Sequence, residues 1–300
     1  MTDPLPPSDL RFLQGLNSIQ SRMERVQREV SSGKRIFAAS DEPDAVSPLL
    51  GARAALQANV QLKSNLGRTK AEVDAAENGL QQSVKILERA RVLAGQAQSD
   101  FNGATTWDSL KQESDDLTQQ LLGIANSTIE GRYIFSGNSD STKPFDYDPS
   151  LNSFTPYAGS MASRQSLYPN GNPFDIAHSG QQIFDSTNPG ASAFAALKQL
   201  SDALSARDSS AVASAMQSIE GAFSHVSGEL SFYGAVQRRV YEATAVAETN
   251  DLSLQTQLNR LEGADSASAI LEMQQAQFNQ QAALQIRGQR PHTSLFDYLG

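Results

Sequence analysis

Apolar residues near the start of the chain recur every four and three positions between residues 12 and 30. This spacing places them on one face of an α-helix, and the alternation is typical of helices that pack in pairs. The pattern stops before Gly33, which favours a helix C-cap, and Asp44 is well placed to start the next helix. The stripe consists of Phe12, Leu16, Ile19, Met23, Val26 and Val30.

Four more helices are expected from similar spacing. One runs to about residue 100 with a stripe from Leu66 to Leu87, and another starts near Thr105 and ends before Gly131. The longest pattern covers 212–261, where Gln237, Thr244 and Asp251 interrupt an otherwise regular apolar seam. A last helix over 265–287 carries Ile270, Met273 and Leu284.

The prolines separate these helical spans from different material in the middle of the chain. Two spans without proline, 49–143 and 190–290, flank a middle segment (137–190) that is rich in turn formers. Its Asn170-Gly171 pair predicts a tight turn between short strands. The fold class we predict is mainly α: a long antiparallel helical rod or coiled coil, formed by the N- and C-terminal arms, with a small β-rich insert.

The corresponding domain organisation has three parts. A discontinuous terminal helical assembly domain would comprise 1–44 and 263–300, an α-helical rod 45–136 and 191–262, and a β-rich outer insert the middle segment. We expect the middle segment to decorate the rod and to be dispensable, because insertions with neighbouring ends usually cost little.

Composition and charge exclude several function classes. The chain has 24 Lys and Arg against 33 Asp and Glu, a net charge of −9, which argues against binding nucleic acid. It has no cysteine, so disulfides, thiol nucleophiles and cysteine-based metal sites are absent. No apolar run approaches the ~18 residues that span a bilayer, so no membrane insertion is expected. The N-terminus shows no cleaved signal peptide.

Candidate chemistry is sparse. The three histidines, His178, His225 and His292, lie in different regions without metal-ligand spacing. The alternating oxygens from Asp146 onward lack the turn glycine of a calcium loop, because Leu151 takes its place. We therefore expect no catalytic residues, no metal and no cofactor, and predict that the chain is not an enzyme.

The terminal stripes are too narrow to stabilise isolated helices, since most helical stability comes from packing. The apolar residues at the C-terminus also have no obvious cover. Either the ends form a two-helix stalk with a frayed tail, or they fold on joining identical or related chains. The second interpretation predicts an assembly interface made of Phe12, Leu16, Ile19, Met23, Val26, Val30, Ile270, Met273, Leu284, Leu295, Phe296, Tyr298 and Leu299.

Four motifs in order along the chain resemble the bacterial flagellin superfamily. The run EVSSGKRIFAASDEPDAV (29–46) is similar to its N-terminal signature, and Asp41-Glu42-Pro43 within it is closer to the hook–filament junction branch. GRYIFSG (131–137) and TSLFDYL (293–299) also resemble that branch. LEGAD (261–265) resembles the bend before the last helix, with Gly263 in place of an acidic residue. The prolines of the first eleven residues depart from the family's usual start.

The resemblance implies paired terminal helices, a helical rod and an outer β-rich domain. It implies an extracellular flagellar protein that is exported unfolded without a cleaved signal peptide and that joins the hook to the filament. The implied partners are copies of itself, the first hook-associated protein, flagellin and a flagellar export chaperone. Two alternatives are a divergent filament flagellin and an intracellular coiled-coil adaptor, although the adaptor would not explain the terminal tail or the insert.

Overall fold

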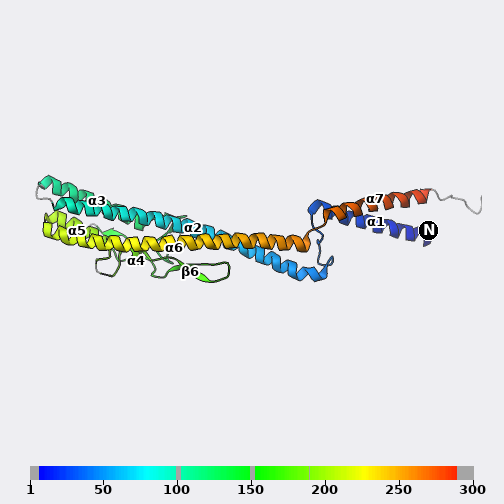
Figure 1. Cartoon of the computed structure of the whole chain (residues 1–300), viewed down its shortest axis with the longest axis horizontal. Helices are drawn as coiled ribbons and strands as arrows, with labels where there is room; N and C mark the ends of the chain where they lie inside the picture. The colour runs from blue at the N-terminus through cyan, green and yellow to red at the C-terminus, as the bar shows by residue number, and fades with distance from the viewer. Residues whose placement is uncertain (1–6, 99–102, 149–152, 189, 289–300) are drawn as a thin grey trace, which may run out of the picture. The chain divides into compact units, whose positions relative to one another are not determined.

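The computed structural model describes residues 7–98, 103–148, 153–188 and 190–288, and most of these are helical (Figure 1). This confirms the predicted mainly α class. Proline suits the first turn of a helix, where its missing N–H is not needed, and Pro43 begins the second helix in this way. The helices are α1 (Pro7–Ser32), α2 (Pro43–Ala97), α3 (Ala104–Ala125), α4 (Gly180–Phe184), α5 (Ala193–Ala206), α6 (Ser209–Glu262) and α7 (Ser266–Gly288).

The strands form three separate antiparallel pairs in the described part of the chain. They are β1 (Thr128–Ile129) with β2 (Arg132–Tyr133), β3 (Tyr147–Asp148) with β4 (Ser153–Phe154), and β5 (Arg164–Leu167) with β6 (Pro173–Ala177). The predicted turn joins β5 and β6, and Gly171 supplies the positive φ of 85° that it needs.

Contacts divide the chain into two compact units. Unit 1 comprises residues 1–57 and 251–300, and unit 2 comprises 58–250. The middle segment lies within unit 2 together with the surrounding helices. The three-part organisation with a separate outer domain stays a prediction.

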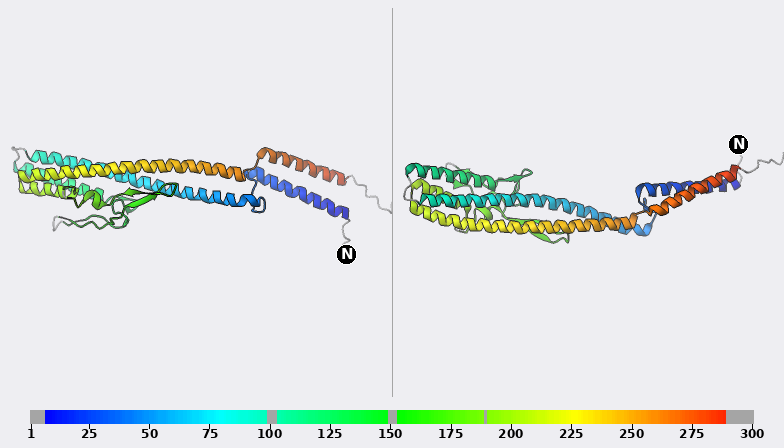
Figure 2. Two further views of the ribbon diagram at one scale, coloured as in Figure 1. Left: turned by 60° about the horizontal axis from the view of Figure 1, so that its bottom comes forward. Right: turned by 45° about the horizontal axis from the view of Figure 1, so that its top comes forward.

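Within unit 2, α2 and α6 run side by side in opposite directions (Figure 2). Hydrogen bonds along the pair show the direction, because Asn59 Nδ2 donates to the Ala247 carbonyl and Gln237 Nε2 donates to Asp74. This is the antiparallel helix pair that the sequence predicted.

The buried face of α6 differs in phase from the predicted seam. One series of residues seven apart, from Val212 through Tyr233 to Ala247, is buried as expected. The second buried series contains Val236 and Ala243, whereas the half-buried Gln237 and Thr244 lie beside it. Gln237 and Thr244 therefore lie at the edge of the core, and the core positions next to them, Val236 and Ala243, are apolar.

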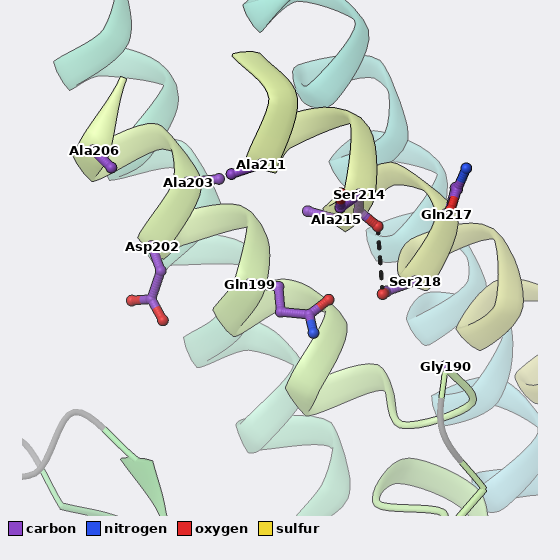
Figure 3. A pocket seen from close by; sticks show the side chains of 10 residues that line it. All are labelled: Gly190, Gln199, Asp202, Ala203, Ala206, Ala211, Ser214, Ala215, Gln217 and Ser218. Atoms are coloured by element: carbon purple, nitrogen blue, oxygen red, sulfur yellow. Dashed lines mark hydrogen bonds between the residues drawn. The ribbon is translucent and has the colours of Figure 1, made fainter. Parts of the chain in front are cut away.

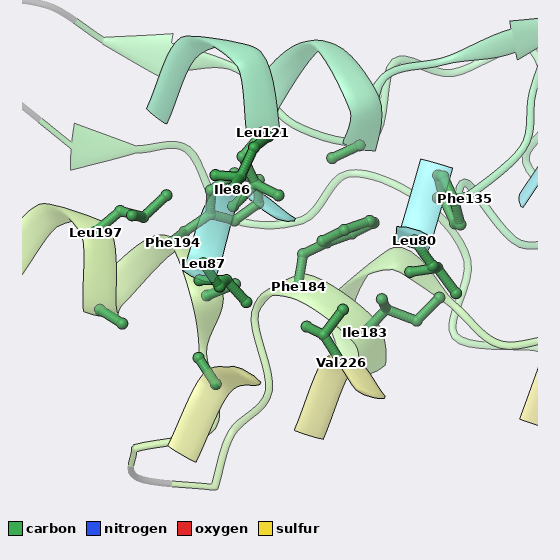
Figure 4. Close-up of a cluster of buried hydrophobic side chains, with 14 of the residues drawn as sticks. Leu80, Ile86, Leu87, Leu121, Phe135, Ile183, Phe184, Phe194, Leu197 and Val226 are labelled. Atoms are coloured by element: carbon green, nitrogen blue, oxygen red, sulfur yellow. The ribbon is translucent and has the colours of Figure 1, made fainter. Parts of the chain in front are cut away.

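The middle segment contributes large aromatic side chains to the core of unit 2 (Figure 4). Phe184 is fully buried, with its ring centroid 5.1 Å from that of Phe135, which lies just before the segment, and Phe145 meets Phe194 of α5 at 5.0 Å. Ile183 of α4 is also fully buried in this cluster. The expectation that this segment only decorates the helices is wrong, because its aromatic residues fill space between them.

Candidate assembly surface

The two terminal helices, α1 and α7, pack against each other within unit 1. The predicted stripe of α1 lies on its least exposed side: Val26 is buried, and Phe12, Leu16, Ile19, Met23 and Val30 are half-buried. The corresponding positions of α7 are mostly small, with Ala269 and Ala276 buried and Met273 half-buried. Small residues at every seventh position allow the two helix backbones to approach closely.

Ion pairs at both ends of the α1–α7 contact fix its antiparallel direction. Arg287 Nη1 lies 2.6 Å from Asp9 Oδ1, and its guanidinium stacks 5.3 Å from the centre of the Phe12 ring. At the other end, Arg25 Nη2 lies 2.9 Å from Glu272 Oε1. Because these side chains are partly exposed, each pair contributes little energy, and their main effect is on alignment.

The chain crosses between α6 and α7 beside the end of α1. Gly33 has a φ of 68°, a conformation that favours glycine, and its carbonyl accepts a hydrogen bond of 2.9 Å from the Ala264 N–H. The Arg35 N–H donates to the Glu262 carbonyl at 2.8 Å. The segments resembling the family signature, 29–46 and 261–265, are therefore adjacent in space.

Asp41 closes the loop that follows α1. Its Oδ2 accepts hydrogen bonds of 2.8 Å from the backbone N–H groups of Phe37 and Ala38. These two bonds, from Ala38 and Phe37, lower the pKa of Asp41 below its ordinary value. The loop is thus held by an ionised carboxylate at neutral pH.

The outer side of α7 carries large apolar residues that the described chain leaves uncovered. Leu271, Phe278 and Ile286 are 66%, 70% and 66% exposed. Given a rotation of about 100° per residue, Leu271 and Phe278 lie roughly opposite the Ala269 and Ala276 side of the helix, and Ile286 lies about a quarter-turn from it. All residues from 273 to 286 are uncharged, so the exposed apolar side chains of this stretch, Phe278 and Ile286, lie among glutamines and not among charged residues.

The predicted interface residues of α7 differ in exposure. Met273 is half-buried, whereas Ile270 and Leu284 are 40% and 50% exposed, and the assembly role of all three stays a prediction. Sequence reasoning missed Ala269 and Ala276, and it missed the outer residues Leu271, Phe278 and Ile286. The spacing of seven between Leu271 and Phe278 was the available signal. Leu295, Phe296, Tyr298 and Leu299 lie outside the described residues.

Other surfaces of the described chain show no arrangement typical of catalysis. An open groove of about 750 Å³ between α5 and α6 is lined by alanines and serines, together with Gln199, Asp202 and Gln217 (Figure 3). Among residues 7–98, 103–148, 153–188 and 190–288, no group of acidic or histidine side chains is placed to hold a metal ion. None of the helices described is long and apolar enough to cross a membrane.

The histidines are closer together than the sequence indicated. His178 follows β6, and His225 lies on α6, but both contact Gln182 of α4. His292 lies outside the described residues.

Comparisons with known proteins match both arms of the chain. Curated relatives include Flagellar hook-associated protein 3 of Escherichia coli strain K12, 28% identical over 268 residues, which are 88% of this chain and 82% of that protein. The protein of the same name from Salmonella typhimurium is 31% identical over 183 residues, 58% of this chain and 54% of its own.

Solved structures show the same fold. Bacillus cereus FlgL aligns with a TM-score of 0.58 at 22% identity, covering 70% of this chain and 99% of that one. Flagellar hook associated protein-3 from Legionella pneumophila aligns with a TM-score of 0.62 at 14% identity, covering 70% and 98%. Residues 8–140 match the bacterial flagellin N-terminal helical region and residues 216–299 match the bacterial flagellin C-terminal helical region. With most of its length in these two regions, the chain belongs to the bacterial flagellin family.

Proposed function

We propose that this chain is a structural component of the bacterial flagellum that joins the hook to the flagellin filament. The observation that carries the proposal is the match to Flagellar hook-associated protein 3 over 88% of the chain. Matches to flagellins are shorter, 39% of the chain for Clostridium tyrobutyricum flagellin and 38% for Rhizobium meliloti flagellin D. The junction role therefore has more support than the role of filament subunit.

The partners follow from this role. They are copies of the same chain, the first hook-associated protein, flagellin and an export chaperone, and the location is extracellular, after export without a cleaved signal peptide. The relatives named above are flagellar proteins, and we extend a structural role without catalysis to the present chain.

We place the contacts with these partners on the terminal helices. The predicted interface residues of α1 and α7 remain part of the proposal, and the structure adds Leu271, Phe278 and Ile286 as outward-facing candidates. Exposed apolar side chains in a stretch without charges suit burial against another subunit, because no ion has to lose its water there. Exposed apolar patches on soluble proteins often mark such contacts.

The first prediction concerns Phe278. Replacement by glutamine should leave the isolated protein's free energy of unfolding within about 0.5 kcal/mol, because the side chain is 70% exposed. Cells that depend on this variant should bear hooks without filaments and release flagellin into the medium. Motility assays and electron microscopy of the flagella measure this outcome.

Met161→Gln is the matched control, since Met161 is 65% exposed but belongs to the middle segment. Cells with this control should swim normally. Full-length filaments in the Phe278→Gln strain would remove the outer side of α7 from the interface. Antibody labelling tests the role itself, because a label along the whole filament would identify a filament flagellin and a label at the hook boundary a junction protein.

A further inference from the structure

A carboxylate occupies a core position in the middle of α6. Glu229 belongs to a buried series of residues seven apart, in which the other members are small or aliphatic: Ala215, Ala222, Val236 and Ala243. Glu229 is only 8% exposed. A buried carboxylate is costly unless another group pairs with it, so the structure must provide a partner.

The partner comes from the middle segment. His178, directly after β6, places Nδ1 2.5 Å from Glu229 Oε2. Its ring stacks on Phe232 with centroids 3.7 Å apart and planes 13° apart. Gln182 of α4 adds a neutral amide, whose Nε2 lies 3.5 Å from Glu229 Oε1. The contact therefore joins the β6–α4 region to α6.

Several titratable groups surround this contact. The Tyr233 hydroxyl accepts a hydrogen bond of 3.3 Å from the His178 backbone N–H, and burial raises the pKa of Tyr233 so that it stays protonated. His225 meets the Gln182 carbonyl at 2.7 Å. Burial raises the pKa of Glu72, against the lowering effect of Arg164, whose guanidinium pairs with it at 2.5 Å. Arg164 is thus engaged with Glu72, whereas His178 is a basic side chain in direct contact with Glu229.

We propose that His178 and Glu229 form a proton-dependent clasp, which holds the β6–α4 region (residues 173–184) on α6 more tightly at pH 6 than at pH 8. The proposal is independent of the junction role, because it concerns how the middle segment is held to its own chain.

The direction follows from the partners of the imidazole in its two states. Histidine ordinarily changes charge between pH 5 and 8. In the clasped state a protonated His178 faces a carboxylate and the face of an aromatic ring, both of which favour a cation. In the opened state it faces water, so protonation stabilises the clasped state relative to the opened one. We therefore expect the clasp to be more stable at acidic than at alkaline pH.

A labelling experiment on the full chain tests the clasp. Because the natural sequence has no cysteine, Ala177→Cys introduces a single thiol at a position only 2% exposed, next to His178. Its rate of reaction with a maleimide reports how often the region opens. Thr187→Cys, at an exposed position, gives the reference rate at each pH and cancels the pH dependence of the thiol itself.

The ratio of the reference rate to the rate of the Ala177→Cys variant should rise about fivefold from pH 8 to pH 6, as expected for one hydrogen bond gaining charge. In combination with His178→Gln or Glu229→Gln the ratio should no longer depend on pH. His225→Gln should retain the dependence, since His225 contacts a backbone carbonyl and not Glu229. A pH-independent ratio in the otherwise natural chain, or an unchanged dependence with His178→Gln, would overturn the proposal.

A second measurement avoids the introduced cysteine. Trp107 lies in the core of unit 2, so its fluorescence follows urea unfolding of that unit. The difference in urea midpoint between the natural chain and the His178→Gln variant should be larger at pH 6 than at pH 8. Equal differences at both pH values would contradict the clasp, even if the labelling variants fail to fold.

Discussion

Glu262 illustrates how one side chain holds several segments of unit 1 together. It lies at the end of α6 with its carboxylate 2.9 Å from Lys34 Nζ and in contact with Arg53. Burial raises the pKa of Glu262, but the hydrogen bonds from Lys34 and Arg53 outweigh burial and keep the pKa below its ordinary value. The ionised form is therefore favoured by folding.

Replacing Glu262 by glutamine should weaken the crossing between α6 and α7. At pH 7 we expect the free energy of local unfolding at this crossing to fall by about 1 kcal/mol. The value is modest because both cationic partners are half exposed. Because the pKa of Glu262 is lowered by folding, its ionised form stabilises the fold at neutral pH, and this contribution disappears as the pH falls below the ordinary glutamate range and through the lowered folded-state pKa. The difference between Glu262→Gln and the natural chain should therefore shrink in acid. Amide hydrogen exchange of residues 33–36, compared with the natural chain at each pH, measures the effect.

Glu42→Gln serves as the control, because Glu42 pairs with Arg35 at 2.8 Å but is more exposed than Glu262. Glu42→Gln should change the amide hydrogen exchange of residues 33–36 much less than Glu262→Gln does. If both variants change exchange equally, the buried position of Glu262 has no special effect.

Individual roles could be predicted where the residue type carries a strong signal. Gly33 was expected at a helix end and has the positive φ that ends α1. The alanines facing α1 were not predicted, because alanine is neither strongly apolar nor rare in this chain and gives no visible stripe. The exposed Phe278 shows the opposite difficulty: its apolar character alone does not reveal whether its own chain covers it.

Among the helices, α6 offers two glycines in contrasting surroundings. A Cβ at Gly221 would lie 2.2 Å from the carbonyl oxygen of Gly190, whereas a Cβ at Gly228 would meet nothing within 4 Å. Gly228→Ala should therefore raise the free energy of unfolding by up to ~1 kcal/mol through helix propensity. Gly221→Ala should lower it by about 1–3 kcal/mol, because backbone has to move. Urea unfolding followed by Trp107 fluorescence compares the two, and changes of equal sign would contradict this assignment.

Element boundaries were predictable where apolar spacing is long and regular, as for α1 and α6. The separate helix α5 was not predicted, because it ends at Arg207 with a φ of 54°. The left-handed residue that follows a helix is usually glycine, which can be recognised in a sequence. An arginine at this position gives no such signal. Elsewhere in unit 2, β2 ends at Tyr133, and the next two residues, Ile134 and Phe135, are buried in the core of the unit.

At the scale of the whole chain, the middle segment should prove essential for unit 2. A variant in which a short linker connects Gly137 to Gly190 lacks Phe145, Ile183 and Phe184, all of which are buried. Loss of a single buried phenylalanine typically costs about 3–5 kcal/mol, so removal of several should unfold the unit. Trp107 fluorescence and circular dichroism should report a solvent-exposed tryptophan and reduced helix content.

Met161→Gln with Leu167→Gln is the control in the same segment, since both side chains are half or more exposed. This double variant should keep a buried tryptophan and cooperative unfolding. If the deletion keeps them as well, the helices of unit 2 are self-sufficient, as the sequence alone had indicated.

The pairing of α1 with α7 also has a consequence for the order in which the chain folds. Unit 1 draws residues from both ends of the sequence, and the bridge between Lys34 and Gly263 joins positions more than two hundred residues apart. Closing so long a loop is slow, and during synthesis it cannot happen until the last helix has left the ribosome. During most of translation, α1 is therefore present without α7 to pack against. A factor that binds this arm early meets no competition from α7 during that interval.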